Sequence, residues 1–260
     1  MPSPIAELGP VSGLRGVLCD IDDTLTWEGR LIPEALLALR QAQEAGLRVV
    51  PVTGRPAGWV DHLARMWPVD GVVGENGGLW FWMQDGRLQR RFLQSVEERA
   101  ENRARLDRIA AEILAEVPGT ALASDQPYRE LDLAIDFCED VPPLGDAAAD
   151  RVAEAFRRHG ATAKISSIHV NGWFGDFDKV AGFRLFHQDR WGEVLDPRAW
   201  VFFGDSANDA PMFQTFPLSV GVANVARFLP RLLHPPTFIT KAPGGHGFVE
   251  GLARVLEMRA

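Results

Sequence analysis

Short apolar runs alternate with amphipathic segments along most of this 260-residue chain. The segment from Pro33 to Gly46 has the pattern of a helix, because proline is tolerated in the first turn and glycine commonly follows the last one. Further helices are predicted through Trp59 and Leu63 and from about residue 247. Strands that alternate with helices predict an α/β fold with a Rossmann-like, doubly wound parallel sheet. The runs that resemble buried strands are residues 17–20, 48–53, 71–73, 199–203, 218–222 and 237–239.

The middle of the chain follows a different order. A long charged amphipathic helix is predicted over residues 95–117 and a second helix over residues 146–159. Each is followed by two short strand candidates, which gives the order αββαββ and predicts an antiparallel sheet covered on one face by two helices. We therefore expect an α+β domain at 94–173, inserted into a core made of 1–93 and 174–260. The four strand candidates are residues 120–124, 131–137, 163–166 and 168–170.

The composition of the chain argues against some classes of binding partner. Acidic residues number 35 against 27 basic ones, for a net charge of −8. No cluster of lysine and arginine with interleaved aromatic residues occurs, so we expect no nucleic-acid partner. No apolar run is long enough to cross a bilayer, and the N-terminus lacks the features of a signal peptide. Cys19 and Cys138 make no disulfide framework, which favours a cytoplasmic protein. The sequence does not indicate an oligomeric state.

The first predicted strand ends in a cluster of acidic residues, Cys-Asp-Ile-Asp-Asp-Thr, at residues 19–24. Alternate residues of an extended chain share one face, so Asp20 and Asp22 can point into the same site. Asp205 follows another predicted strand and can meet Asp20 around one hard cation, which prefers oxygen ligands. The alternative is an acidic turn in which Asp23 or Thr24 caps a helix.

Four polar clusters occur in a fixed order near the ends of predicted strands. Together they resemble the haloacid dehalogenase superfamily of phosphotransferases, and the αββαββ insert resembles the cap of its class II, subtype B. The segment Gly74-Glu75-Asn76-Gly77-Gly78 with its following hairpin also resembles that subclass. The clusters are DxDxT at 20–24, the threonine of Thr53-Gly54-Arg55, Lys179 after the insert, and GDxxND at 204–209.

The resemblance implies a chemical role for each matching residue. Asp20 would attack phosphorus and become an aspartyl-phosphate, while Asp22 would protonate the departing oxygen and later activate water. Thr24 would orient Asp22. Mg²⁺ would be held by Asp20, Asp205 and the backbone carbonyl of Asp22, with Asp209 acting through water or bracing the site. The residues implied for the phosphate are Thr53, Gly54, Lys179 and Asn208.

Substrate contacts are expected mainly from the cap, because a lid that closes over the site commonly supplies specificity. The family neighbours act on sugar phosphates and phosphoglycosides, including sucrose, trehalose and mannosylglycerate phosphates. The sequence therefore predicts a Mg²⁺-dependent phosphatase for a small phosphorylated molecule of this kind. A phosphomutase and a non-catalytic sugar-phosphate binding module remain the alternatives. The candidate contact residues, each of which could equally be a plain surface residue, are Arg129, Lys164, Ser166 and His169 from the cap and Arg55, Glu75 and Asn76 from the core.

Overall fold

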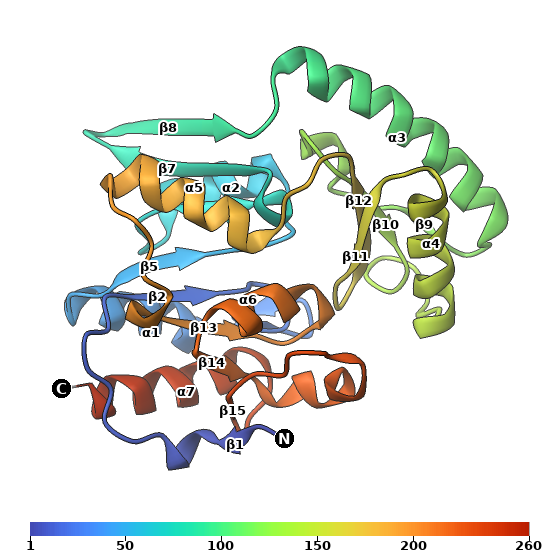
Figure 1. The fold of residues 1–260 in the computed structure, drawn as a ribbon. Helices are drawn as coiled ribbons and strands as arrows, with labels where there is room; N and C mark the ends of the chain where they lie inside the picture. Colours follow the sequence, from blue (N-terminus) through green and yellow to red (C-terminus); the bar gives the residue numbers. More distant parts are fainter. Residues whose placement is uncertain (260) are drawn as a thin grey trace.

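A six-stranded parallel sheet forms the centre of the protein in this computed structural model, which describes residues 1–259 (Figure 1). In its strand order β1-β15-β14-β13-β2-β5 every neighbouring pair is parallel. The neighbouring strands β2 and β13 are aligned so that Cys19 lies beside Phe203. The strands are β1 (Ser3–Pro4), β2 (Gly16–Cys19), β5 (Arg48–Pro51), β13 (Trp200–Gly204), β14 (Leu218–Gly221) and β15 (Phe238–Ile239).

Helices cover both faces of this sheet, as the uninterrupted apolar character of the strands requires. Val17 and Cys19 belong to the hydrophobic cluster that includes α1 (Pro33–Glu44), α2 (Ala57–Met66) and α7 (Gly244–Met258). Leu18, between them, points to the other face and packs with α5 (Lys179–Trp191) and α6 (Ala210–Thr215). The predicted Rossmann-like, doubly wound core is confirmed.

The predicted strand at 71–73 is present but pairs mainly outside the parallel sheet. It forms β6 (Val72–Gly74), which is antiparallel to β7 (Leu79–Gln84) and continues into the hairpin with β8 (Arg87–Phe92). Its one link to the core sheet is a parallel bridge between Val52 and Val73. The remaining short elements are β3 (Thr26–Trp27), β4 (Arg30–Leu31), and the 3₁₀ turns Ile5–Glu7, Glu75–Gly77, Gln126–Tyr128, Pro197–Ala199, Ala207–Asp209, Ala223–Arg227 and Leu229–Arg231.

The inserted segment folds around an antiparallel four-stranded sheet of its own. The chain order α3-β9-β10-α4-β11-β12 is the predicted αββαββ, and the two helices share a separate hydrophobic cluster with the sheet. Helix α3 begins with a capping box between Ser95 and Glu98. The elements are α3 (Val96–Glu116), β9 (Ala121–Leu122), β10 (Leu133–Asp136), α4 (Asp146–Arg158), β11 (Thr162–Ile165) and β12 (His169–Trp173).

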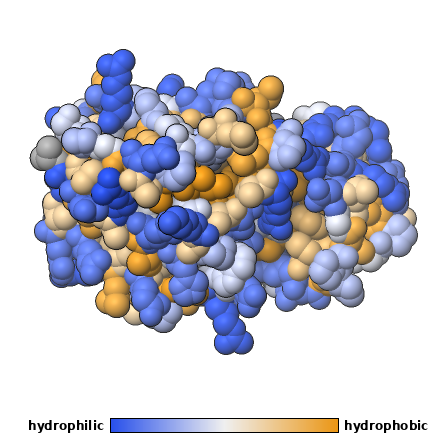
Figure 2. Space-filling model, turned by 90° about the horizontal axis from the view of Figure 1, so that it is seen from below, coloured by the Kyte–Doolittle hydropathy of each residue, from blue (hydrophilic) through white to orange (hydrophobic). Residues whose placement is uncertain are grey.

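The insert lies beside the edge of the core sheet at which β2 and β13 end (Figure 1). Both lobes carry mostly hydrophilic residues on the face shown in Figure 2, with hydrophobic residues gathered within the larger lobe. No helix within residues 1–259 is both long enough and apolar enough to cross a membrane.

Candidate active site

Three buried carboxyl groups meet where β2 and β13 end. Asp20 directly follows β2, Asp205 directly follows β13, and the Asp20 N–H donates to the carbonyl of Phe203 at 2.9 Å. One oxygen from each of Asp20, Asp205 and Asp209 lies within 4.8 Å of the others. The sequence-based expectation that carboxylates from two strand ends converge agrees with this geometry.

A single lysine lies within reach of this acidic cluster. Lys179 begins α5, and its Nζ is 2.9 Å from Asp20 Oδ1 and 2.7 Å from Asp209 Oδ1. Burial, followed by nearby carboxylates, still raises the pKa of Asp20 to about 7 although Lys179 opposes the shift. Burial and the charges of Asp209 and Asp20 raise the pKa of Asp205 well above its usual range. Three carboxyl groups and one ammonium group leave an excess of negative charge in a dry site.

The donor set fits a hard divalent cation. Asp20 Oδ1 is buried and has no aligned hydrogen-bond donor within residues 1–259, since its contact with Lys179 is an ion pair only. Asp205 accepts from the Asn224 side chain at 3.1 Å and retains lone pairs for a cation. Oxygen ligands of this kind are those that Mg²⁺ prefers. Asp20 and Asp205 are therefore the residues that would hold the ion.

Asp209 has a bracing position in the cluster. Its Oδ1 accepts from Lys179, and its Oδ2 accepts from the backbone N–H groups of Asp205 and Ser206. A Cβ added at Gly204 would lie 2.5 Å from this carboxylate, so only glycine leaves room for it there. This arrangement agrees with the expectation that Asp209 braces the site.

The Asp22 carboxylate is not part of this three-residue cluster and is held by an arginine. Arg55 Nε lies 3.0 and 2.9 Å from the two Asp22 oxygens, and Nη2 lies 2.8 Å from Oδ1. We expected Arg55 to contact substrate, whereas in the structure it is engaged with carboxylates. The Thr24 hydroxyl donates to Asp205 Oδ1 at 3.5 Å, and the role of Thr24 in orienting Asp22 stays a prediction.

The residues expected to bind phosphate lie at the ends of β5 and β13. Thr53 is fully buried, and its hydroxyl accepts from the Arg55 N–H at 3.1 Å. Gly54 packs against the Asn76 amide, where an added Cβ would lie 3.3 Å from Nδ2. Asn208 accepts from the Ser206 hydroxyl at 2.8 Å.

A narrow cavity of about 10 Å³, roughly the space of one water molecule, lies between these motifs and the cap. The cap residues Arg129, Ser166 and His169, which are candidates for substrate contact, line it together with Ile168 and Asn171. The core contributes Asp20, Asp22, Gly54, Arg55 and Asn208.

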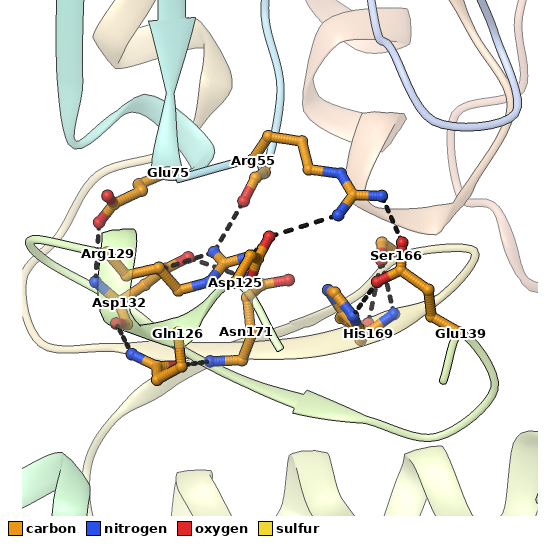
Figure 3. Close-up of polar contacts among 12 residues, drawn as sticks. Arg55, Glu75, Asp125, Gln126, Arg129, Asp132, Glu139, Ser166, His169 and Asn171 are labelled. Carbon is orange, nitrogen blue, oxygen red and sulfur yellow. Dashed lines mark hydrogen bonds and ion pairs between the residues drawn. The ribbon is translucent and has the colours of Figure 1, made fainter. Parts of the chain in front are cut away.

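The cap side of the cavity is a continuous buried polar network (Figure 3). Arg129 pairs with Asp125 at 3.0 Å and Asp132 at 2.9 Å, and it also donates to the Gly54 carbonyl of the core. Asp132 in turn accepts from the Asn171 side chain at 2.8 Å. Sequence reasoning missed Asp125, Asp132 and Asn171. The one available signal was the charge of Asp132 inside the apolar run at 131–137, because buried carboxylates need partners.

Arg55 connects the core to this network. Besides Asp22, its guanidinium group reaches Asp125 at 3.3 Å and Glu139 at 2.6 Å. Glu139 also lies 2.8 Å from Nε2 of His169. Glu139 lies in a loop, and no local pattern in the sequence indicated that it contributes to the site.

Three of the expected substrate contacts lie outside the cavity. Glu75 is buried and accepts from the backbone N–H groups of Ala57, Glu130, Leu131 and Asp132, so it ties the cap to the core. The Asn76 side chain donates to Asp132 at 3.5 Å. Lys164 is on the outermost strand, β11, and faces a separate groove that it shares with Arg227. The expectation that these three line the cavity is not met.

Comparisons with known proteins agree with this architecture. Residues 17–97 match the family described as haloacid dehalogenase-like hydrolase. The phosphoglycolate phosphatase of Methanothermobacter thermautotrophicus is 26% identical over 245 residues, which cover 94% of this chain and 99% of that protein.

Solved structures with the same fold include Thermoplasma acidophilum 0175, with a TM-score of 0.71, 20% identity, and coverage of 94% of this chain and 99% of that one. The sucrose-phosphatase of Synechocystis sp. PCC6803 has a TM-score of 0.65 and 15% identity, and the match covers 95% of this chain and 98% of that one. The sugar phosphatase BT4131, described as subclass IIB of the haloacid dehalogenase superfamily, has a TM-score of 0.63 and 13% identity. The match covers 92% of this chain and 98% of that one. The chain therefore carries a haloacid dehalogenase-like hydrolase region at residues 17–97, is similar over nearly its whole length to proteins named phosphatases, and shares the fold of these solved structures.

Proposed function

We propose that the protein is a Mg²⁺-dependent phosphomonoester hydrolase that works through an aspartyl-phosphate on Asp20. The observation that carries this proposal is the buried Oδ1 of Asp20, which lies 2.9 Å from Lys179 Nζ and has no other partner among the described residues. This oxygen follows β2 and belongs to a residue that lines the cavity, so it is placed to act as a nucleophile. The bound cation would neutralise negative charge on the carboxylates and on the phosphate oxygens.

The side chains then divide the reaction between them. Asp20 forms a bond to phosphorus while the bond to the leaving oxygen breaks, and Asp22 gives that oxygen a proton. In the second step water attacks phosphorus, Asp22 takes its proton, and the bond to Asp20 breaks. Lys179 supplies fixed positive charge near the phosphate, and Arg55 fixes the orientation of Asp22. Thr53, Gly54 and Asn208 are proposed to hold the phosphate oxygens.

The substrate is proposed to be a small phosphorylated metabolite. The sequence favoured a sugar phosphate, and the archaeal relative named above is a phosphoglycolate phosphatase. We also propose that residues 94–173 form the cap that closes this cavity. The free thiols of Cys19 and Cys138 support a reducing, cytoplasmic location.

The test is the release of inorganic phosphate from an aryl phosphate and from a panel of small phosphate esters, with Mg²⁺ or with a chelator. We expect phosphate release with Mg²⁺ only, and a phosphorylated Asp20 in acid-quenched reactions. Conversion of sugar phosphates to isomers without phosphate release would instead identify a mutase. Undiminished hydrolysis in chelator would overturn the proposed mechanism.

A further inference from the structure

Every arginine that lines the cavity is already paired with carboxylates of this chain. Arg55 is shared by Asp22, Asp125 and Glu139, and Arg129 is shared by Asp125 and Asp132. His169, the remaining basic side chain of the lining, lies 2.8 Å from Glu139. Within the described chain, the lining therefore offers a substrate no cation that lacks an acidic partner.

The charges on the leaving-group side are unequal. Two guanidinium groups face four carboxylates, so the network carries an excess of two negative charges apart from His169. The side chains of Arg55 and Arg129 are 6% and 0% exposed, so solvent screens this excess only weakly. A second anion in this cavity would meet net repulsion.

Glu139 is the member of the network through which this charge can be changed. Its side chain is 27% exposed, whereas those of Asp125 and Asp132 are 7% and 0% exposed. The nearby Arg55 guanidinium group and His169 ring hold the pKa of Glu139 at about 2 against its burial, so Glu139 is ionised at neutral pH. It pairs with both Arg55 and His169, which line the cavity.

We propose that the enzyme selects phosphomonoesters with a small, uncharged, hydroxylated leaving group and rejects those that carry a carboxylate, with Glu139 as the specificity-determining residue. Hydroxyl groups can donate to the carboxylates of the network and accept from the Asn171 amide or the arginines. A carboxylate would have to displace Glu139 from Arg55, which would leave a charged group without its partner. This inference rests on the proposed phosphatase function.

The groove outside the cavity is the competing explanation for substrate charge selection. Lys164 and Arg227 face it, and neither forms an ion pair with an acidic residue within the described part of the chain. Ser166 lines both the groove and the cavity. A substrate carboxylate that reached Lys164 or Arg227 would make the enzyme favour anionic leaving groups, which is the opposite of the proposed selectivity.

The experiment compares phosphoglycolate with 2-hydroxyethyl phosphate, which has a similar size and lacks the carboxylate. We expect kcat/KM to favour the uncharged ester by roughly tenfold or more, since charge discrimination in a desolvated site is of this order. Glu139→Gln keeps the shape of the side chain and should raise the ratio of kcat/KM for phosphoglycolate to kcat/KM for 2-hydroxyethyl phosphate roughly tenfold. The matched control is Asp140→Asn, which removes the same charge from the adjacent exposed residue and should leave the ratio unchanged.

Binding measurements separate failure of this inference from failure of the proposed function. Calorimetric titration of Asp20→Asn with each ester and Mg²⁺ gives dissociation constants without turnover, and the double variant with Glu139→Gln gives the effect of the charge. If phosphoglycolate binds more weakly than 2-hydroxyethyl phosphate, and Glu139→Gln reduces this difference, the charge selection is supported even if no phosphate is released. A wild-type preference for phosphoglycolate, or a preference abolished by Arg227→Ala rather than altered by Glu139→Gln, would overturn it.

Discussion

At the scale of single residues, Asp20 is a buried carboxyl group that we propose to be the nucleophile. Asp20 is 4% exposed, and its cationic neighbour, Lys179, also pairs with Asp209. Asp23, three positions later, is only partly buried and has a positive φ of 56°. The two aspartates thus separate a reactive position from a turn position within one short segment.

Replacing Asp20 with asparagine should reduce aryl-phosphate turnover by roughly a thousandfold or more, because a carboxamide cannot form the acyl-phosphate. Thermal unfolding should show an intact protein, since removal of one charge relieves repulsion in the cluster. Asp23→Asn is the matched control, and asparagine tolerates its positive φ; we expect a loss of less than about tenfold. Turnover of Asp20→Asn near the wild-type rate would contradict the role of Asp20.

The stability of the metal-free protein should fall as the pH rises from about 4 to 7. The pKa of Asp20 is raised to about 7 in the folded state, so the folded protein binds more protons than the unfolded one across this range. Each extra proton that the folded state binds lowers the free energy of unfolding by up to about 1.4 kcal/mol for each unit by which the pH rises. Thermal melts in chelator should show the decline, and Mg²⁺ should raise Tm most at neutral pH, where the carboxylates are ionised.

Asp205→Asn provides the check on that result. It removes one carboxylate from the cluster, so the response of Tm to Mg²⁺ should weaken while the chelator-treated variant becomes at least as stable as the wild type at pH 7. An unchanged Mg²⁺ response in Asp205→Asn would place the cation elsewhere.

At the scale of elements, the turn after β6 joins the two lobes. Glu75 and Asn76 both have positive φ values, 44° and 55°, a conformation that asparagine tolerates and that is unfavourable for glutamate. The conformation points the Glu75 carboxylate at the N–H groups of residues 130–132 in the cap. The cost of the strained turn is offset by a buried connection between the core and the cap.

Glu75→Gln should destabilise the protein by about 3 kcal/mol, because the new amide N–H group would face backbone donors and leave some of them unpaired. For a chain of this size the expected fall in Tm is roughly 6–12 °C. The control is Glu130→Gln on the same segment, whose carboxylate is 46% exposed and pairs only with Arg99 among the described residues. Equal melting temperatures for both variants would show that the Glu75 contacts contribute little.

The contrast between these elements explains what sequence could reveal. Strands such as β2 and β13, and the helix α3 with its capping box, follow from apolar runs and local signals, and the carboxylates at the strand ends follow from the topology. The partners of Arg55 and Arg129 come from loops and from a separate sheet, and ion-pair geometry depends on how two lobes pack. Nothing local in the segment around Glu139 shows that it meets a residue 84 positions earlier in the chain.

At the scale of the whole molecule, the two chain segments that connect the cap to the core lie at a single place. The Gln94 side chain donates to the carbonyl of Phe174 at 2.6 Å, so the chain enters and leaves the cap side by side. The cap has its own hydrophobic cluster, and its contacts with the core include the Arg55, Arg129 and Glu75 networks. The two lobes are therefore separable along the chain but electrostatically connected across the cavity.

Removal of residues 94–173, with a short flexible linker in their place, should leave a core with weak Mg²⁺-dependent activity on aryl phosphates. Selectivity among small phosphate esters should fall to within about threefold, because the cap supplies the contacts to the leaving group. The core should also melt at a lower temperature, since Glu75 loses three of its four backbone donor residues. A folded core that kept the selectivity of the full chain would locate specificity outside the cap.

The strand order also determines when the active site can form during synthesis. β2 receives its neighbour β5 early, but its other neighbour, β13, lies beyond the whole cap in the sequence, and β1 pairs with β15 near the opposite end of the chain. All partners within the cap sheet lie between residues 121 and 173. A nascent chain halted before residue 200 would therefore hold a complete cap, while Asp20 would sit on a strand with one unpaired edge. Because long-range strand pairing is slow and leaves such edges exposed to aggregation, the emerging enzyme should depend on chaperones until its last quarter has left the ribosome.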